Sequence, residues 1–79
     1  MNIGMLWFDG DRKVELGQRI ERAAGYYRSK YGQRPNVCFV HPATVNGDAP
    51  KLATGIEVRT SLAVLPDHFW LGVEEAQDA

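Results

Sequence analysis

The sequence predicts a small α/β (α+β) domain in which one long helix covers one face of a four-stranded mixed sheet. Three observations indicate this class: two short apolar runs, a long amphipathic segment between them, and a C-terminal segment that alternates apolar and polar residues. The 79 residues are expected to form a single domain, 1–79, near the lower size limit at which one hydrophobic core is sufficient.

The first predicted element is a strand over residues 3–8, which is apolar on both faces, as is typical of a strand covered on both sides. A helix over residues 12–31 follows. Its apolar side chains fall within about 100° of arc, and they are Leu16, Ile20, Ala23, Ala24, Tyr27 and Tyr31. Asp11 is expected to cap the start of this helix, and Gly32 to end it in the left-handed conformation.

A second strand is predicted over residues 37–41, again apolar on both faces. A strand, a helix and a strand with short connections indicate a βαβ unit, whose two strands run parallel. Residues 42–54 contain an Asn-Gly pair and two prolines, which favour turns, and this segment is expected to form a loop.

The C-terminal segment predicts a β-hairpin with strands over residues 56–64 and 69–74 and a turn at Pro66-Asp67. This register collects the apolar side chains of both strands on one face of the hairpin. The cross-strand pairs that it predicts are Val64 with Phe69, Leu62 with Leu71, and Thr60 with Val73.

The hairpin register places Trp70 on the polar face, opposite Ala63 and near Leu65. A tryptophan buries roughly 200 Å² when it is covered, so leaving it in water is unfavourable. One helix also cannot cover both faces of a sheet whose first two strands are apolar on both. We therefore expect Trp70, Leu65 and Ala63 to form an interface, either in a homo-oligomer (a dimer) or with another protein partner. Burial of Trp70 within the monomer, beneath the loop over residues 42–54, is the alternative interpretation.

The charges are unevenly distributed although the net charge is only −1. Residues 12–34 hold seven of the nine Lys and Arg residues together with two Glu. Five side chains of this segment lie within about 80° of arc beside the apolar side of the helix, and they are Arg12, Arg19, Arg22, Tyr26 and Lys30. Cationic groups with an interleaved aromatic ring suit the binding of an anionic partner, either a nucleic-acid backbone or an acidic protein surface. A solvated helix face is the alternative interpretation.

Four side chains form a candidate metal site. Asp9 and Asp11 follow the first strand, His41 ends the second, and His68 begins the last. The C-terminal ends of parallel strands meet at one edge of a sheet, and an antiparallel last strand brings its start to that same edge. Two carboxylates and two imidazoles suit Zn²⁺ or Mn²⁺. The alternative interpretation is a turn at Asp9-Gly10 followed by a helix cap at Asp11.

Cys38 is the only cysteine, so no disulfide can form within the chain, and an intracellular, cytoplasmic setting is expected. Cys38 lies in an apolar run and is expected to be a small buried hydrophobe. No stretch approaches the ~20 apolar residues that span a bilayer, so no membrane contact is expected.

These observations favour a non-enzymatic interaction module that self-associates or docks on a protein partner through its sheet. The first alternative is a nucleic-acid-binding accessory protein that uses the basic side of the helix, and the second is a small metal-dependent hydrolase. The sequence shows no phosphate-binding glycine loop, nucleophile elbow, zinc finger or calcium loop, so no cofactor is expected.

Overall fold

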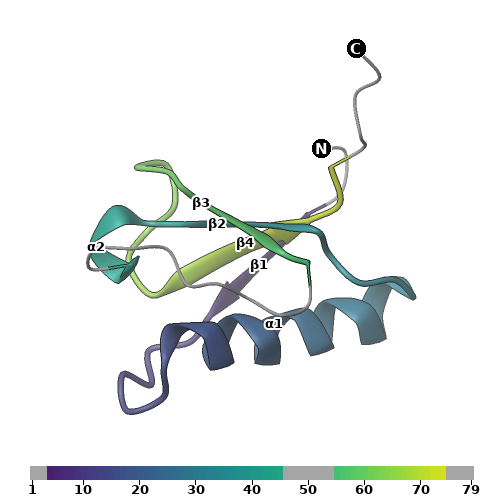
Figure 1. Ribbon diagram of the computed structural model, residues 1–79, viewed down its shortest axis with the longest axis horizontal. Coiled ribbons are helices and arrows are strands. Elements are labelled where there is room, and N and C mark those ends of the chain that lie inside the picture. Colours follow the sequence, from purple (N-terminus) through teal and green to yellow (C-terminus); the bar gives the residue numbers. More distant parts are fainter. Residues whose placement is uncertain (1–3, 46–54, 75–79) are drawn as a thin grey trace.

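The computed structural model describes residues 4–45 and 55–74, which form one four-stranded mixed sheet with a long helix along one face (Figure 1). The predicted fold class is thereby confirmed. In chain order the elements are β1 (Gly4–Phe8), α1 (Leu16–Tyr31), β2 (Val37–Val40), α2 (Pro42–Val45), β3 (Glu57–Thr60) and β4 (His68–Gly72).

The strands lie in the order β1-β4-β2-β3. β4 is antiparallel to both of its neighbours, whereas β2 and β3 are parallel. Because β1 and β2 both run opposite to β4, they run parallel to each other, as the predicted βαβ unit requires. The last strand of the chain, however, lies between them.

The predicted C-terminal hairpin is wrong. β3 pairs with β2, where Val58 lies opposite Cys38, and β4 pairs with β1 and β2 instead of β3. Phe69, expected opposite Val64, lies between Trp7 and Val40. The predicted pairs of Leu62 with Leu71 and of Thr60 with Val73 are likewise not formed.

The polarity of the two strands explains this arrangement. Phe69 and Leu71 of β4 are fully buried, so this strand occupies the middle of the sheet. β3 carries Glu57 and Arg59, and at the edge of the sheet these charged side chains reach water. Alternation of apolar and polar residues indicates which face a residue takes, but it does not identify the neighbouring strand.

The connection between β3 and β4 consists of tight turns where the sequence predicted strand. The Ser61 hydroxyl oxygen accepts a hydrogen bond from the Ala63 N–H (3.1 Å), and the Leu65 carbonyl accepts one from the His68 N–H (3.1 Å). Asp67 lies inside the second of these turns and has a φ of 60°. Since β3 and β4 lie on opposite sides of β2, residues 61–67 cross β2.

The helix begins later than predicted and ends where predicted. Glu15, not Asp11, is the N-cap residue, and its carboxylate makes no capping bond within the described chain. The Asp11 carbonyl accepts a bond from the Val14 N–H, which forms a turn ahead of the helix. Gly32 has a φ of 79° and donates its N–H to the Arg28 carbonyl, which confirms the predicted C-cap.

Other boundaries differ slightly from the predictions. The second strand ends at Val40, one residue early, and the predicted loop at 42–54 opens with the single turn of α2. Residues 46–54 of that loop, and residue 3 of the first predicted strand, lie outside the described residues.

The core lies between α1 and one face of the sheet. Ile20, Ala23, Ala24 and Tyr27 supply the helix side, as the periodicity predicted. The sheet side is supplied by Met5, Cys38, Val40, Phe69 and Leu71, with Val45 and Ile56 closing the ends. Burial raises the pKa of the Cys38 thiol to about 12, so this cysteine stays neutral and serves as a small apolar residue.

The glycine in the middle of α1 supplies a test of how this helix packs. No described atom lies within 4 Å of a Cβ placed on Gly25. Gly25→Ala should therefore raise the free energy of unfolding by about 1 kcal/mol, because alanine favours the helix and meets no obstacle. Gly32→Ala is the control, since its positive φ makes it destabilising. Urea denaturation measures both; a loss of stability in Gly25→Ala would contradict the open packing at this position.

Candidate functional site

The edge at which β1 and β2 end carries the predicted metal residues. Phe8, the last residue of β1, lies opposite His68, and the Asp9 N–H donates to the Asp67 carbonyl at 3.0 Å. His41 directly follows β2 at this edge. The expectation that one edge of the sheet holds Asp9, His41 and His68 therefore agrees with the topology.

The side chains at this edge nevertheless have other partners. Asp9 Oδ2 lies 3.0 Å from Arg22 Nη2, and Asp11 Oδ2 lies 3.8 Å from the same atom. His41 Nδ1 accepts the Ala43 N–H (3.0 Å), and His68 Nδ1 lies 2.8 Å from the Pro66 carbonyl oxygen. Within residues 4–45 and 55–74, no three His, Cys, Asp or Glu side chains gather so as to hold a metal ion. The four predicted ligands are thus not brought together as one donor set.

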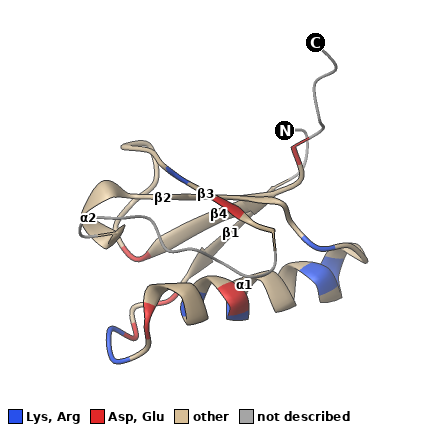
Figure 2. Ribbon diagram, in the orientation of Figure 1, with Lys and Arg blue, Asp and Glu red and all other residues tan. Residues whose placement is uncertain are grey.

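The predicted anion-binding side chains also have partners within the chain. Arg12 Nη2 lies 3.0 Å from Asp67 Oδ2, and Arg22 pairs with Asp9 as described above. Tyr26 stacks on Trp7 with ring centroids 4.4 Å apart, and the Lys30 ammonium lies 5.4 Å from the ring centroid of its neighbour Tyr31. Figure 2 shows acidic and basic stretches side by side where β1 leads into α1.

Arg19 forms the central link of this charged cluster. Only 6% of the residue is exposed, and its guanidinium lies over the Phe69 ring, 5.8 Å from the centroid. Nη1 donates to the Asp9 carbonyl (3.1 Å) and to Asp67 Oδ1 (3.3 Å). Arg19 therefore ties α1 to the segments that follow β1 and precede β4.

The Asp67 carboxylate accepts hydrogen bonds from Arg12 and Arg19. The sequence did not predict this role. The hydrogen bond from Arg12, aided by Arg19, holds the pKa of the Asp67 carboxyl below its ordinary value. Its backbone N–H donates to the Thr44 hydroxyl at 2.9 Å, which links the turn to α2. The Pro-Asp pair indicated a turn, but nothing in the local sequence indicates partners 48 and 55 residues away.

Replacing Asp67 by Asn tests this cluster through pH. Asparagine tolerates the positive φ but carries no charge, so Asp67→Asn should lower the free energy of unfolding at neutral pH by about 2 kcal/mol, because the buried Arg19 loses its charged partner. A lowered folded-state pKa stabilises the fold above the unfolded value of 3.8 and loses that contribution as pH falls through the folded value. The stability difference between wild type and Asp67→Asn should therefore shrink below that pH.

Urea denaturation at a series of pH values makes this measurement. Asp11→Asn is the matched control, since its side chain is 48% exposed and 3.8 Å from Arg22, and it should have little effect. A difference between wild type and Asp67→Asn that stays constant over the whole pH range would contradict the role assigned to the Asp67 charge.

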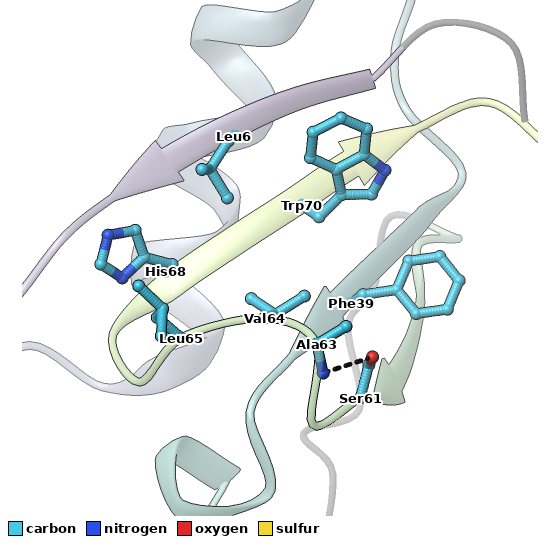
Figure 3. Close-up of a pocket in the computed structure, with 8 residues that line it drawn as sticks. All are labelled: Leu6, Phe39, Ser61, Ala63, Val64, Leu65, His68 and Trp70. Carbon is cyan, nitrogen blue, oxygen red and sulfur yellow. Dashed lines mark hydrogen bonds between the residues drawn. The ribbon is translucent and has the colours of Figure 1, made fainter.

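The face of the sheet turned away from α1, here called the open face, carries a second set of apolar side chains. Leu6, Trp70 and Phe39 are cross-strand neighbours on β1, β4 and β2. The turns that cross β2 stand above them, and together they enclose a pocket of about 570 Å³ (Figure 3). Its lining residues are Leu6, Phe39, Ser61, Ala63, Val64, Leu65, His68 and Trp70.

Trp70, Leu65 and Ala63, the predicted interface residues, all line this pocket. They are brought together by the crossing of residues 61–67 over β2, and not by the hairpin that the sequence predicted. Alternation along β4 nevertheless assigned Trp70 to the face away from the core, and this part of the interpretation agrees with the structure.

Several large apolar side chains on and beside the open face reach solvent. Leu6 is 56% exposed, Phe8 63%, Leu65 65% and Leu62 81%. Phe8 lies on the same face, where its ring is 5.0 Å from that of His68. Exposed apolar side chains gathered in this way are typical of a binding surface.

The charges at the rim of the open face compensate one another. Arg59 lies over the Phe39 ring, 5.8 Å from its centroid, and donates to both carboxylate oxygens of Glu74 at 2.7 and 2.8 Å. Its Nε also donates to Glu57 at 3.0 Å. These bonds raise the pKa of Arg59 and lower that of Glu74, so both remain charged and paired.

Gly4 makes room for the Trp70 ring on this face. A Cβ placed on Gly4 would lie 2.8 Å from Trp70 Nε1 and closer still to the six-membered ring. The indole therefore lies against the backbone of β1, where any other residue would displace it.

Gly4→Ala should move the Trp70 ring and lower the free energy of unfolding by about 1 kcal/mol, because the ring must leave its contact with β1. Fluorescence in a Trp7→Phe background reports Trp70 alone, and its emission should shift when Gly4→Ala is added to that background. An unchanged spectrum and unchanged stability would contradict the close approach of ring and backbone.

Comparison with protein-family models yields no match for this chain, and comparisons with curated proteins and with solved structures likewise yield none. Of the helices in the described ranges, none has the length and apolar character needed to cross a membrane. Function is therefore inferred from the surface itself.

Proposed function

We propose that this chain is a non-enzymatic interaction module that binds a second copy of itself through the open face. The observation that supports this most strongly is the apolar pocket with Leu6, Phe8 and Leu65 exposed beside or within it. A partner that covers these side chains gains about 25 cal/mol of binding free energy for each Å² of apolar surface removed from water. α1 lies on the other face and covers none of them (Figure 3).

The shape of the open face suits a symmetric contact. A two-fold interface brings the same surface of each copy together, so it needs a hollow and projecting groups on one face. The pocket supplies the hollow, and exposed side chains such as Phe8 and Leu65 supply the projections. Trp70 within the pocket is the residue type most often found to dominate binding energy at protein interfaces.

The rim charges also favour a second copy over a strongly charged partner. Arg59 is neutralised by Glu57 and Glu74, so two copies can approach without like charges meeting. A nucleic acid, the alternative partner, would have to displace Asp9 and Asp67 from the arginines with which they pair. The hydrolase alternative has no gathered set of metal ligands among the described residues to support it.

Sedimentation velocity over a concentration series tests the proposal. The wild type should pass from monomer to dimer as the protein concentration rises. Leu65→Lys should weaken that association about tenfold or more, because a charge would lose its hydration in the contact. Leu65 is 65% exposed, so this replacement leaves the core intact.

Gln18→Lys is the matched control, because it adds the same charge at an exposed position of α1, on the other side of the sheet. It should dimerise as the wild type does. A wild type that remains monomeric at every concentration, or equal weakening by both replacements, would contradict the proposed interface.

A further inference from the structure

We propose that the open-face pocket is also a binding site for an uncharged, planar aromatic molecule, which competes with the second copy. The competition depends on the proposed function, whereas the binding of the small molecule does not. The pocket belongs to the folded monomer, since all of its lining residues come from one chain.

The size and walls of the pocket suit such a ligand. Its volume of about 570 Å³ lies within the roughly 300–1,000 Å³ of small-molecule sites. Trp70 and Phe39 offer aromatic rings, and Leu6, Val64 and Leu65 add aliphatic groups around them (Figure 3). Aromatic rings pair by offset stacking or edge-to-face contact, so a planar ring system gains most from these walls.

Contacts within the chain hold the walls of the pocket in place. Gly4 lets the Trp70 indole lie against β1, which fixes one wall. The opposite wall is formed by side chains of the segment 61–65. It is held in its turns by two hydrogen bonds, one from the Ala63 N–H to the Ser61 hydroxyl and one from the His68 N–H to the Leu65 carbonyl. A pocket whose walls are held before binding needs little reorganisation to take a ligand.

The electrostatics of the pocket favour an uncharged ligand. None of its described lining residues is Asp, Glu, Lys or Arg. Arg59, which lies over Phe39, already binds two carboxylates and is therefore not free to receive an anion. An anion or a cation would lose its hydration here without gaining a partner of opposite charge.

Two polar side chains, Ser61 and His68, line the pocket and allow a single polar substituent on the ligand. The Ser61 hydroxyl accepts one hydrogen bond and still has its own hydrogen to donate. His68 Nδ1 lies 2.8 Å from the Pro66 carbonyl, which can only accept, so this nitrogen carries the hydrogen in the neutral ring. A hydroxylated aromatic molecule such as 2-naphthol matches this combination of walls and polar groups.

Titration of the ¹⁵N-labelled full chain with 2-naphthol at neutral pH tests the site by NMR. Saturable shifts are expected at the Trp70 indole N–H and at the amides of Ala63, Val64 and Leu65. The anionic analogue 2-naphthalenesulfonate, with the same ring system, should bind at least about tenfold more weakly. This comparison uses the wild type alone, so it does not depend on any variant folding.

Ala63→Phe, which fills the pocket from an exposed position, should weaken 2-naphthol binding by about tenfold or more. Leu62→Phe is the matched control: it adds a ring at the neighbouring residue, which does not line the pocket, and should bind as the wild type does. Absence of saturable shifts, equal binding of the sulfonate, or full binding by Ala63→Phe would each overturn the site.

The competition is tested separately by sedimentation of the wild type with and without saturating 2-naphthol. A lower dimer fraction with the ligand is expected, and a dimer that binds 2-naphthol without dissociating would overturn the competition. A chain that binds 2-naphthol but never dimerises would contradict the proposed function and leave the ligand site standing. The two failures are therefore distinguishable.

Discussion

The structure depends on one constraint: a sheet has two faces, and residues 4–45 and 55–74 supply one long helix to cover them. α1 buries Phe69 and Leu71 on one face and leaves Leu6, Phe39 and Trp70 on the other. A 79-residue chain has little apolar surface to spare, because its core only narrowly outweighs the loss of conformational entropy on folding. Apolar side chains left on the second face therefore call for a physical explanation, and the docking surface that we propose is one.

The sheet order creates the pocket on that face. Because β4 lies between β1 and β2 while β3 lies on the far side of β2, residues 61–67 must cross β2, and they do so on the open face. Asp67 stands where this crossing ends, and its bonds to Arg12, Arg19 and the Thr44 hydroxyl fix the start of β4. The charged cluster, interpreted from sequence as a metal site and an anion surface, thus holds the crossing in place.

The periodicity from Leu16 to Tyr31 predicted the helix and its buried side, because these depend on neighbours three or four residues apart. The end of the helix was predicted from Gly32 itself, which adopts the left-handed conformation easily. Strand pairing was not predictable in the same way. Alternation of apolar and polar residues over 56–64 is compatible with any partner strand. The same alternation extends past Thr60, where β3 ends, and includes Leu62, which is 81% exposed. The role of Asp67 was missed because its partners are remote in sequence. The face that Trp70 takes was predictable because alternation along β4 does not depend on the neighbouring strand.

We propose that a second copy covers the open face, and methyl NMR with a soluble paramagnetic agent tests this proposal most directly. In dilute protein the methyl signals of Leu6 and Leu65 should broaden strongly, and in concentrated protein they should be protected. The buried Leu71 methyls serve as the reference and should be protected throughout. Equal broadening of Leu6 and Leu65 at both concentrations would contradict the account.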